Sequence, residues 1–194
     1  MIEGLLALDP RFHSILADHG EPEIWSRPPG FSTLALFILE QQVSLASARA
    51  TFDRRAPDGV LTPDRVDRTD DAGMRAAGVS RQKIRYLRGL VEAVADGRLV
   101  FEELDDLPDD EARRRLTALT GVGPWTADVY LLACLGRPDV WPAGDRALQV
   151  SAAARLGLET VPDTRTLEQL GEAWRPYRST AARLLWHAYL ADRS

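Results

Sequence analysis

The stretch Gly121-Val-Gly-Pro-Trp125 is a candidate anion-binding turn. It joins two runs of helical apolar spacing, and its glycines supply the positive φ and the missing Cβ that a tight turn between helices requires. Pro124 suits the first turn of the next helix, where its missing amide hydrogen is not needed. The other amides then point outward at a helix N-terminus and can hold a phosphate without any lysine. The simpler alternative is a turn that only ends one helix and begins another, which is the more frequent meaning of an isolated Gly-x-Gly.

A second polar position of interest is Asp145, in Pro-Ala-Gly-Asp just before another apolar helical run. Taken locally, this is ordinary N-capping sequence. Other chemistry is poorly represented in the chain. The three histidines, at positions 13, 19 and 187, have no metal-ligand spacing. Cys134 is the single cysteine, which excludes a four-cysteine zinc or iron–sulfur site.

Composition is typical of a globular protein, with 194 residues, 45% hydrophobic and 27% charged. The formal net charge of −5 argues against coating nucleic acid by bulk electrostatics, so any DNA contact must be local. Lys83 is the only lysine. Arginine suits phosphate better than lysine does, but a genome rich in G and C is the preferred explanation of the arginine bias. No apolar run approaches the roughly 20 residues of a membrane span. The N-terminus has no basic segment of the signal-peptide kind, so we expect a cytoplasmic protein.

The apolar spacing predicts an all-α protein of roughly eight to ten helices. One helical pattern runs through Leu34, Phe37, Ile38, Gln41 and Leu45. A second runs through Ile84, Leu87, Val91 and Val94, with Ser80 as N-cap and Gly97 as stop. Further helices are expected from Pro108, over 125–135, from about 145 to 156, near 167–174 and over 179–191. The predicted breaks are 21–30, 56–63, 136–144 and 157–163.

The residues around the glycine turn, LTGVGPWTA, resemble the hairpin of the helix-hairpin-helix (HhH-GPD) DNA glycosylase superfamily. The resemblance continues in DVWPAGDRALQV, which supplies Asp145 about 20 residues after the hairpin. It also includes ILEQQVSLASARATF (38–52) and GVSRQKIRYLRGLVEAVADG (78–97). WRPYRSTAARLLWHAYL (174–190) is similar to the C-terminal helix of the alkylation-repair branch, the AlkA and yeast Mag type of 3-methyladenine DNA glycosylase. Together these motifs cover roughly residues 30–190 in order.

The resemblance implies a fold of two helical lobes with a DNA-binding cleft between them. Residues 31–145 would form one lobe, and 1–30 with 146–194 the other. It implies a glycosylase that flips an alkylated purine, of the 3-methyladenine or 7-methylguanine kind, out of double-stranded DNA and hydrolyses its N-glycosidic bond. Asp145 would stabilise the oxocarbenium-like sugar and position or deprotonate water.

For the base pocket, the resemblance implies aromatic walls at Trp125 and Trp186, with Trp141 as a lesser candidate. Aromatic rings would hold a cationic base by stacking and cation–π attraction. Val129 stands where relatives can carry a tyrosine, with Tyr130 beside it. For each tryptophan, burial in the core is the alternative.

The DNA backbone would be held by Gly121, Val122, Gly123, Trp125 and Thr126. Gln42 matches the side chain that fills the gap left by the flipped base, and Gln41 would brace the local backbone. Exposed helix-surface glutamines are the alternative for both. A lysine that would allow strand nicking is replaced by Trp125, so we expect no lyase activity.

Na⁺ or K⁺ at the hairpin would bind main-chain oxygens of Thr117, Leu119 and Val122. We expect no other cofactor, no iron–sulfur cluster, no membrane partner and a monomer. Two alternatives stay open: a non-catalytic hairpin module that binds DNA, and a helical protein-interaction domain with no DNA role.

Overall fold

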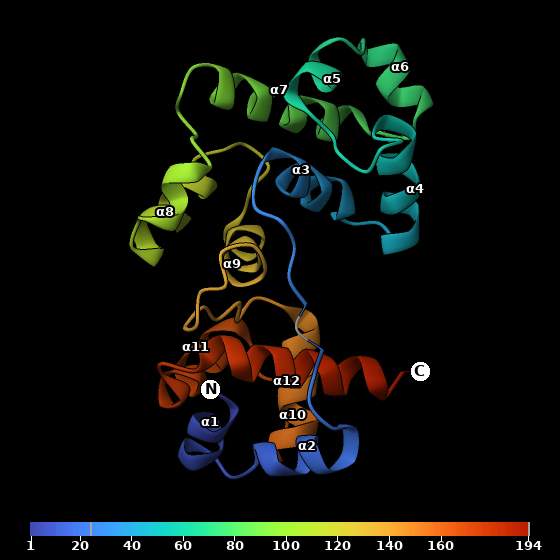
Figure 1. The fold of residues 1–194 in the computed structure, drawn as a ribbon. Coiled ribbons are helices and arrows are strands. Elements are labelled where there is room, and N and C mark those ends of the chain that lie inside the picture. The colour runs from blue at the N-terminus through green and yellow to red at the C-terminus, as the bar shows by residue number, and fades with distance from the viewer. Residues whose placement is uncertain (24, 194) are drawn as a thin grey trace. The chain divides into compact units, whose positions relative to one another are not determined.

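In the computed structural model, which describes residues 1–23 and 25–193, the chain is all-helical and the described part contains no strand, as predicted (Figure 1). The α-helices are α1 (Ile2–Leu8), α2 (Phe12–His19), α3 (Phe31–Glu40), α4 (Leu45–Arg55), α5 (Pro63–Asp67), α6 (Asp71–Ala76), α7 (Arg81–Ala95), α8 (Asp109–Thr117), α9 (Pro124–Ala133), α10 (Arg146–Leu156), α11 (Thr164–Gly171) and α12 (Arg178–Ala191). Two 3₁₀ helices, η1 (Glu102–Asp105) and η2 (Glu172–Trp174), complete the described elements. The expected eight to ten helices were too few, because α5 and α6 are single short turns within 63–76.

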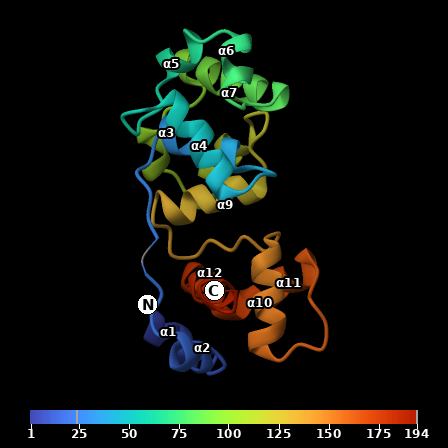
Figure 2. The ribbon, with the colours of Figure 1, turned by 90° about the vertical axis from the view of Figure 1, so that its right-hand side faces the viewer.

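Both chain ends belong to one compact unit, residues 1–26 with 131–194. In this unit α12 packs against α10, α2 and α1, and Figure 2 shows α12 end-on beside them. Asp9 adds a polar link between the N-terminal segment and η2, because its Oδ2 accepts a hydrogen bond from the buried Trp174 indole at 2.9 Å. Hydrogen bonds from Arg11 and Trp174 hold the pKa of Asp9 at about 2, so this carboxylate stays ionised.

The other unit is the continuous stretch Arg27–Tyr130, built around α3. Eight of the ten residues of α3 are buried, and the helix packs against α4 and α7. Helices α5 and α6 pack on α7 as well. An almost wholly apolar helix such as α3 can be stable only when neighbours cover it on every side.

Three sequence expectations need correction here. The second unit boundary lies at 130/131, within α9, and not at Asp145, because residues 137–140 hydrogen-bond to α12. The pattern that ran on to Leu45 is broken at Glu40, and Leu45 is 68% exposed. The buried face of α7 continues through Leu90 and Ala93, one residue ahead of the predicted Val91 and Val94. The predicted N-cap of α7 is confirmed, since the Ser80 hydroxyl accepts from the Lys83 amide.

None of the helices in the described ranges is long and apolar enough to cross a bilayer.

Candidate nucleic-acid interface and active site

The glycine turn is a tight hairpin between α8 and α9. Gly121 has φ of 94°, and the Val122 amide donates to the Leu119 carbonyl at 3.0 Å. A Cβ on Gly121 would lie 2.2 Å from the ring of Tyr86 on α7. Two independent constraints, the positive φ and the aromatic ring, therefore require glycine at this position.

Gln41 joins the α3–α4 turn to the hairpin. Its Nε2 donates to the Gly121 carbonyl at 2.9 Å and lies 3.4 Å from Thr126 Oγ1. The structure thus gives Gln41 a bracing role, on the backbone of the hairpin 80 residues away. The Thr126 side chain is buried beneath the groove, where it contacts Gln41.

An open groove of about 690 Å³ follows the hairpin within the unit 27–130. All the predicted DNA-contact residues and the three residues of the predicted cation site line this groove: Gln41, Gln42, Thr117, Leu119, Gly121, Val122, Gly123, Trp125 and Thr126. The rest of the lining consists of Glu40 and, from α7, Gln82 and Tyr86. The structure therefore brings this predicted set together. Gln82 and Tyr86 were not predicted as lining residues, although both lie in the family-like motif 78–97.

Gln42 lies at the tip of the α3–α4 turn with φ of 57°, which non-glycine residues rarely adopt. Its neighbours Val43 and Leu45 are 46% and 68% exposed. The base of this turn is fixed by Lys83, whose Nζ donates to the Leu39 carbonyl at 2.7 Å near the end of α3. The turn thus presents an exposed side chain on a fixed backbone.

The two predicted pocket residues of α9 have different surroundings. Trp125 is 39% exposed beside the groove, whereas Val129 is 3% exposed. The neighbouring Tyr130 is fully buried, and its hydroxyl accepts from the Gly30 amide at 2.7 Å. Val129 is therefore an interior residue, and its predicted place in a base pocket is not supported.

Asp145 is the N-cap of α10, in the unit formed by the two chain ends. Its Oδ1 accepts from the Leu148 amide at 2.9 Å and from the Trp186 indole Nε1 at 3.1 Å. Both Asp145 and Trp186 are half-buried. The capping role and a chemical role for Asp145 are compatible, and Trp186 of α12 lies in direct contact with the carboxylate.

Trp25 lies against this pair and was missed by the sequence analysis. Its ring centroid is 6.4 Å from that of Trp186, with the planes at 86°. Its position in a turn-rich segment 120 residues before Asp145 gives no local sign of this contact. Its carbonyl accepts from Arg183 Nη1 at 2.6 Å, and Arg183 Nη2 donates to the Leu132 carbonyl at 3.0 Å. Burial lowers the pKa of the Arg183 guanidinium, which means that removing this charge from water costs free energy.

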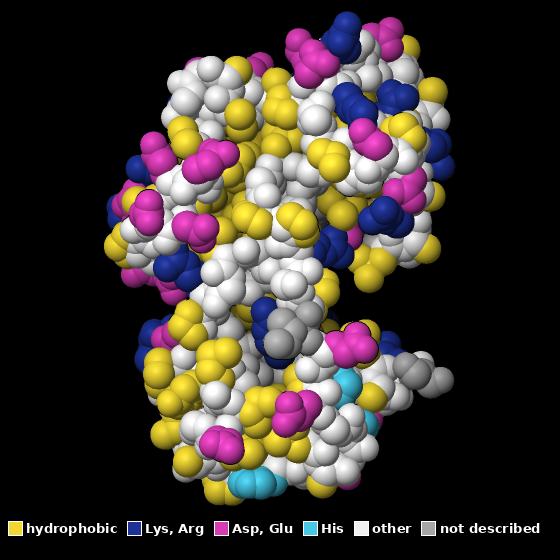
Figure 3. Space-filling view, in the orientation of Figure 1, with side chains coloured by type: hydrophobic (Ala, Val, Ile, Leu, Met, Phe, Trp, Pro, Cys, Tyr) yellow, Lys and Arg dark blue, Asp and Glu magenta, His cyan; other side chains and the backbone are white. Residues whose placement is uncertain are grey.

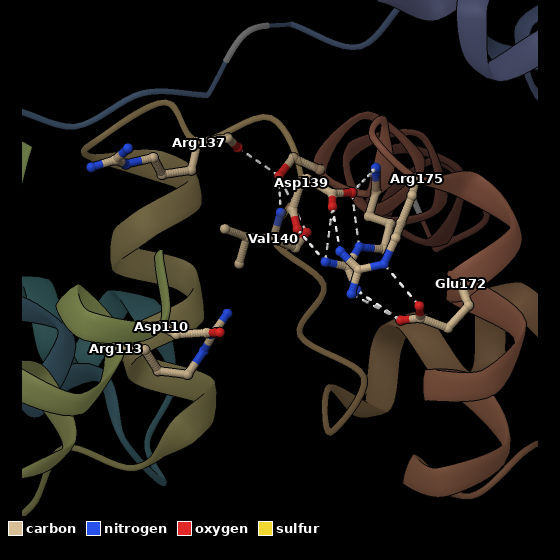
Figure 4. A network of polar contacts seen from close by, with 9 residues as sticks. Asp110, Arg113, Arg137, Asp139, Val140, Glu172 and Arg175 are labelled. Atoms are coloured by element: carbon tan, nitrogen blue, oxygen red, sulfur yellow. Dashed lines mark hydrogen bonds and ion pairs between the residues drawn. The ribbon is translucent and has the colours of Figure 1, made fainter. Parts of the chain in front are cut away.

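The loop that leads to Asp145 is fixed to the start of α12 by an ion network (Figure 4). Asp139 accepts from Arg178 Nε at 2.8 Å and from Arg175 Nη1 at 2.6 Å, while Glu172 accepts from both arginines. The Ser179 hydroxyl bonds the backbone on either side of Asp139, at the Arg137 carbonyl and the Val140 amide. One helix, α12, therefore holds this loop near its beginning and Asp145 at its end.

Trp141, in the same loop, is a core residue. It is 7% exposed, its indole Nε1 donates to the Leu167 carbonyl at 2.9 Å, and its ring meets the Trp174 ring edge-on at 5.1 Å. With its polar atom satisfied inside the unit, Trp141 does not line a base pocket, contrary to the expectation.

The chain combines a glycine hairpin on an open groove with a helix-capping carboxylate bonded to an indole, which are the features expected of a helix-hairpin-helix DNA glycosylase. The sequence model of the HhH-GPD superfamily of base excision DNA repair proteins matches residues 35–176. The chain belongs to this superfamily.

Individual relatives support the same assignment. A DNA-3-methyladenine glycosidase from Bacillus halodurans is 33% identical, with a TM-score of 0.86 over 98% of this chain and 90% of that one. The Schizosaccharomyces pombe 3-methyladenine DNA glycosylase Mag1, solved in complex with abasic DNA, is 28% identical, with a TM-score of 0.79 over 92% and 89% of the two chains. A putative DNA-3-methyladenine glycosylase from Bacillus subtilis is 28% identical over 160 residues, which are 78% of this chain. The match spans just over half, 56%, of that relative.

Proposed function

We propose that the chain is a monofunctional DNA glycosylase of base excision repair, which hydrolyses the N-glycosidic bond of alkylated purines in double-stranded DNA. The observation that carries the proposal is the Asp145 carboxylate, oriented by the Leu148 amide and the Trp186 indole. The names of the relatives point to the same substrates.

In the proposed reaction, the N–C1′ bond breaks and its electron pair leaves with the base. The sugar becomes an oxocarbenium-like cation, which the fixed negative charge of Asp145 stabilises. A water molecule adds to C1′ and gives its proton to the carboxylate, so that the products are the free base and an abasic site. A purine alkylated at N3 or N7 is cationic and leaves easily, so one carboxylate and no strong general acid suffice.

The DNA strand would be held at the groove of the unit 27–130. Exposed Gly123 and the hairpin amides provide an anion site at the start of α9, and Gln42 would fill the gap that the flipped base leaves. The main-chain oxygens of Thr117, Leu119 and Val122 would hold Na⁺ or K⁺ there. All three residues line the groove, and carbonyl oxygens suit such hard cations. The ion would supply positive charge to the same phosphate.

The absence of lyase activity is part of the proposal. Lyase chemistry needs an amine that attacks C1′, and the hairpin offers Trp125 where a lysine would stand. The single lysine, Lys83, donates to the Leu39 carbonyl near the end of α3. Borohydride should therefore trap no covalent complex between the protein and DNA that contains an abasic site.

The test of catalysis is Asp145→Asn, which keeps a capping side chain on α10. We expect release of 7-methylguanine from a methylated duplex to fall by about 10²- to 10³-fold. Melting temperature and affinity for an abasic duplex should stay near the parent's. Base release at the parent rate would refute the catalytic role. A parent protein that binds the duplex but releases no base would instead be a hairpin module that only binds DNA.

A further inference from the structure

Trp25 and Trp186 make an aromatic corner beside Asp145, all within the unit formed by the two chain ends. The two ring planes are perpendicular, and their centroids are 6.4 Å apart. Trp186 directs its Nε1 at Asp145 Oδ1, 3.1 Å away, so Trp25 is one side chain removed from the carboxylate. Trp25 is 38% exposed, which is unusual for so large an apolar side chain.

The structure holds Trp25 in this position by its backbone. Arg183 lies on α12, three residues before Trp186, and donates to the carbonyls of Trp25 and Leu132. Because the Arg183 guanidinium donates to two main-chain carbonyls, it fixes the segments around Trp25 and Leu132 to α12. The segment that carries Trp25 is therefore anchored to the helix that carries Trp186.

Perpendicular rings offer a flat ligand one face and one edge. Trp25 is the more exposed of the two rings, so its face is the one on which an incoming base can stack. The face of an indole is electron-rich and attracts cations more strongly than the face of any other side chain. The nearby Asp145 adds negative charge on the same side of the unit.

We propose that Trp25 is a further wall of the base-binding site and selects positively charged purines by stacking and cation–π attraction. The inference rests on the proposed glycosylase function, because it concerns the base that Asp145 helps to release. Trp25 acts on the flipped base, and the phosphate backbone is held elsewhere.

The test compares Trp25→Phe with Trp25→Leu, which retain similar apolar bulk but differ in having an aromatic face. The measurement is the single-turnover release of 7-methylguanine, a cationic base, from duplex DNA. We expect the Leu variant to be slower by about three- to thirtyfold, as the strength of a cation–π contact implies, and the Phe variant to stay within about threefold of the parent. Both should bind an abasic duplex as the parent does, because that duplex has no base to stack.

Tyr189→Leu is a matched control. Tyr189 lies three residues beyond Trp186 on α12, and its ring is covered by Arg193 at 4.3 Å. This variant should release base at the parent rate. Equal rates for the Phe and Leu variants of Trp25, or an equal loss of affinity for the abasic duplex, would overturn the inference while leaving the glycosylase function intact. A parent protein that releases no base at all would overturn the proposed function, and the inference with it.

Discussion

At the scale of single residues, the site depends on side chains that bond both to the backbone of their own helix and to a residue distant in sequence. Asp145 caps α10 through the Leu148 amide and meets Trp186 from α12 with the same oxygen. Capping could be predicted from Pro-Ala-Gly-Asp, since it depends on neighbours in sequence. The contact between Trp25 and Trp186 could not be predicted, because these residues come from opposite ends of the chain, and Trp186 itself was expected at the site only from the family resemblance. Trp141 was expected in the pocket but is a core residue. The hydrogen bond to the Leu167 carbonyl that holds it there joins residues 26 positions apart, so the local sequence gives no sign of it.

Gln42 allows a test in which stability and activity change in opposite directions. Its φ of 57° is unfavourable for glutamine and easy for glycine, so Gln42→Gly should be as stable as the parent or more so, by up to about 1 kcal/mol. If the side chain fills the gap left by the flipped base, the same variant should release 7-methylguanine from duplex DNA about tenfold more slowly, since unstacking costs a few kcal/mol. Release from single-stranded DNA, where no gap opens, should be unchanged. An equal loss on both substrates would contradict the gap-filling role.

At the scale of elements, α12 is the scaffold of the loop that leads to Asp145. It bonds residues 137–140 through Arg178 and Ser179, and one side of it carries Arg183 and Trp186. The helix itself was predicted to within one residue at its start from apolar periodicity. Its partners were not, because ion networks such as Asp139 with Arg175 and Arg178 join residues 36 and 39 positions apart.

Removal of Asp139 should weaken both the fold and the chemistry. Arg178 is only 13% exposed, and Asp139→Ala would leave its guanidinium with the Asp139 carbonyl and Glu172 as partners. We expect a loss of about 2–3 kcal/mol in the free energy of unfolding, measured by urea denaturation. Well below the melting temperature, single-turnover base release should still fall several-fold with abasic-duplex affinity unchanged, because the loop that orients Asp145 is loosened.

Asp96→Ala is the control for this network. Asp96 pairs with Arg98 at 2.8 Å on the surface, where both side chains are at least half exposed. Its removal should change neither stability nor rate measurably. If the Asp139→Ala variant is less stable but releases base at the parent rate well below its melting temperature, the network stabilises the fold and does not contribute to catalysis.

At the scale of the whole molecule, the all-helical fold and the pairing of the two chain ends in one unit were predictable from periodicity and family resemblance. The boundary of the units was not. The sequence places a break at 136–144, whereas the structure changes unit within α9, because its last residues pack with the chain ends. A helix shared by two units has an unbroken apolar pattern, so its sequence contains no signal of the change.

The charge of the molecule leads to a final prediction on how it binds DNA. The chain carries 29 acidic and 24 basic residues, and Figure 3 shows the two signs interspersed over the unit 27–130 on the face in view. Many arginines of that unit are already paired with acids, among them Arg49, Arg88 and Arg113. The hairpin amides, in contrast, need no cationic side chain to hold a phosphate.

Binding should therefore depend less steeply on salt than that of a protein that contacts six to ten phosphates. If two or three phosphates are neutralised, the logarithm of the association constant should fall with the logarithm of salt concentration at a slope of about −1.8 to −2.7. Affinity for an abasic duplex would then drop by about ten- to fortyfold between 50 and 200 mM salt, measured by fluorescence anisotropy. Gly123→Pro, which removes one amide of the hairpin, should weaken binding at every salt concentration with little change in slope. A slope of −6 or steeper would mean that arginine side chains across a broad surface, and not the hairpin, hold the DNA.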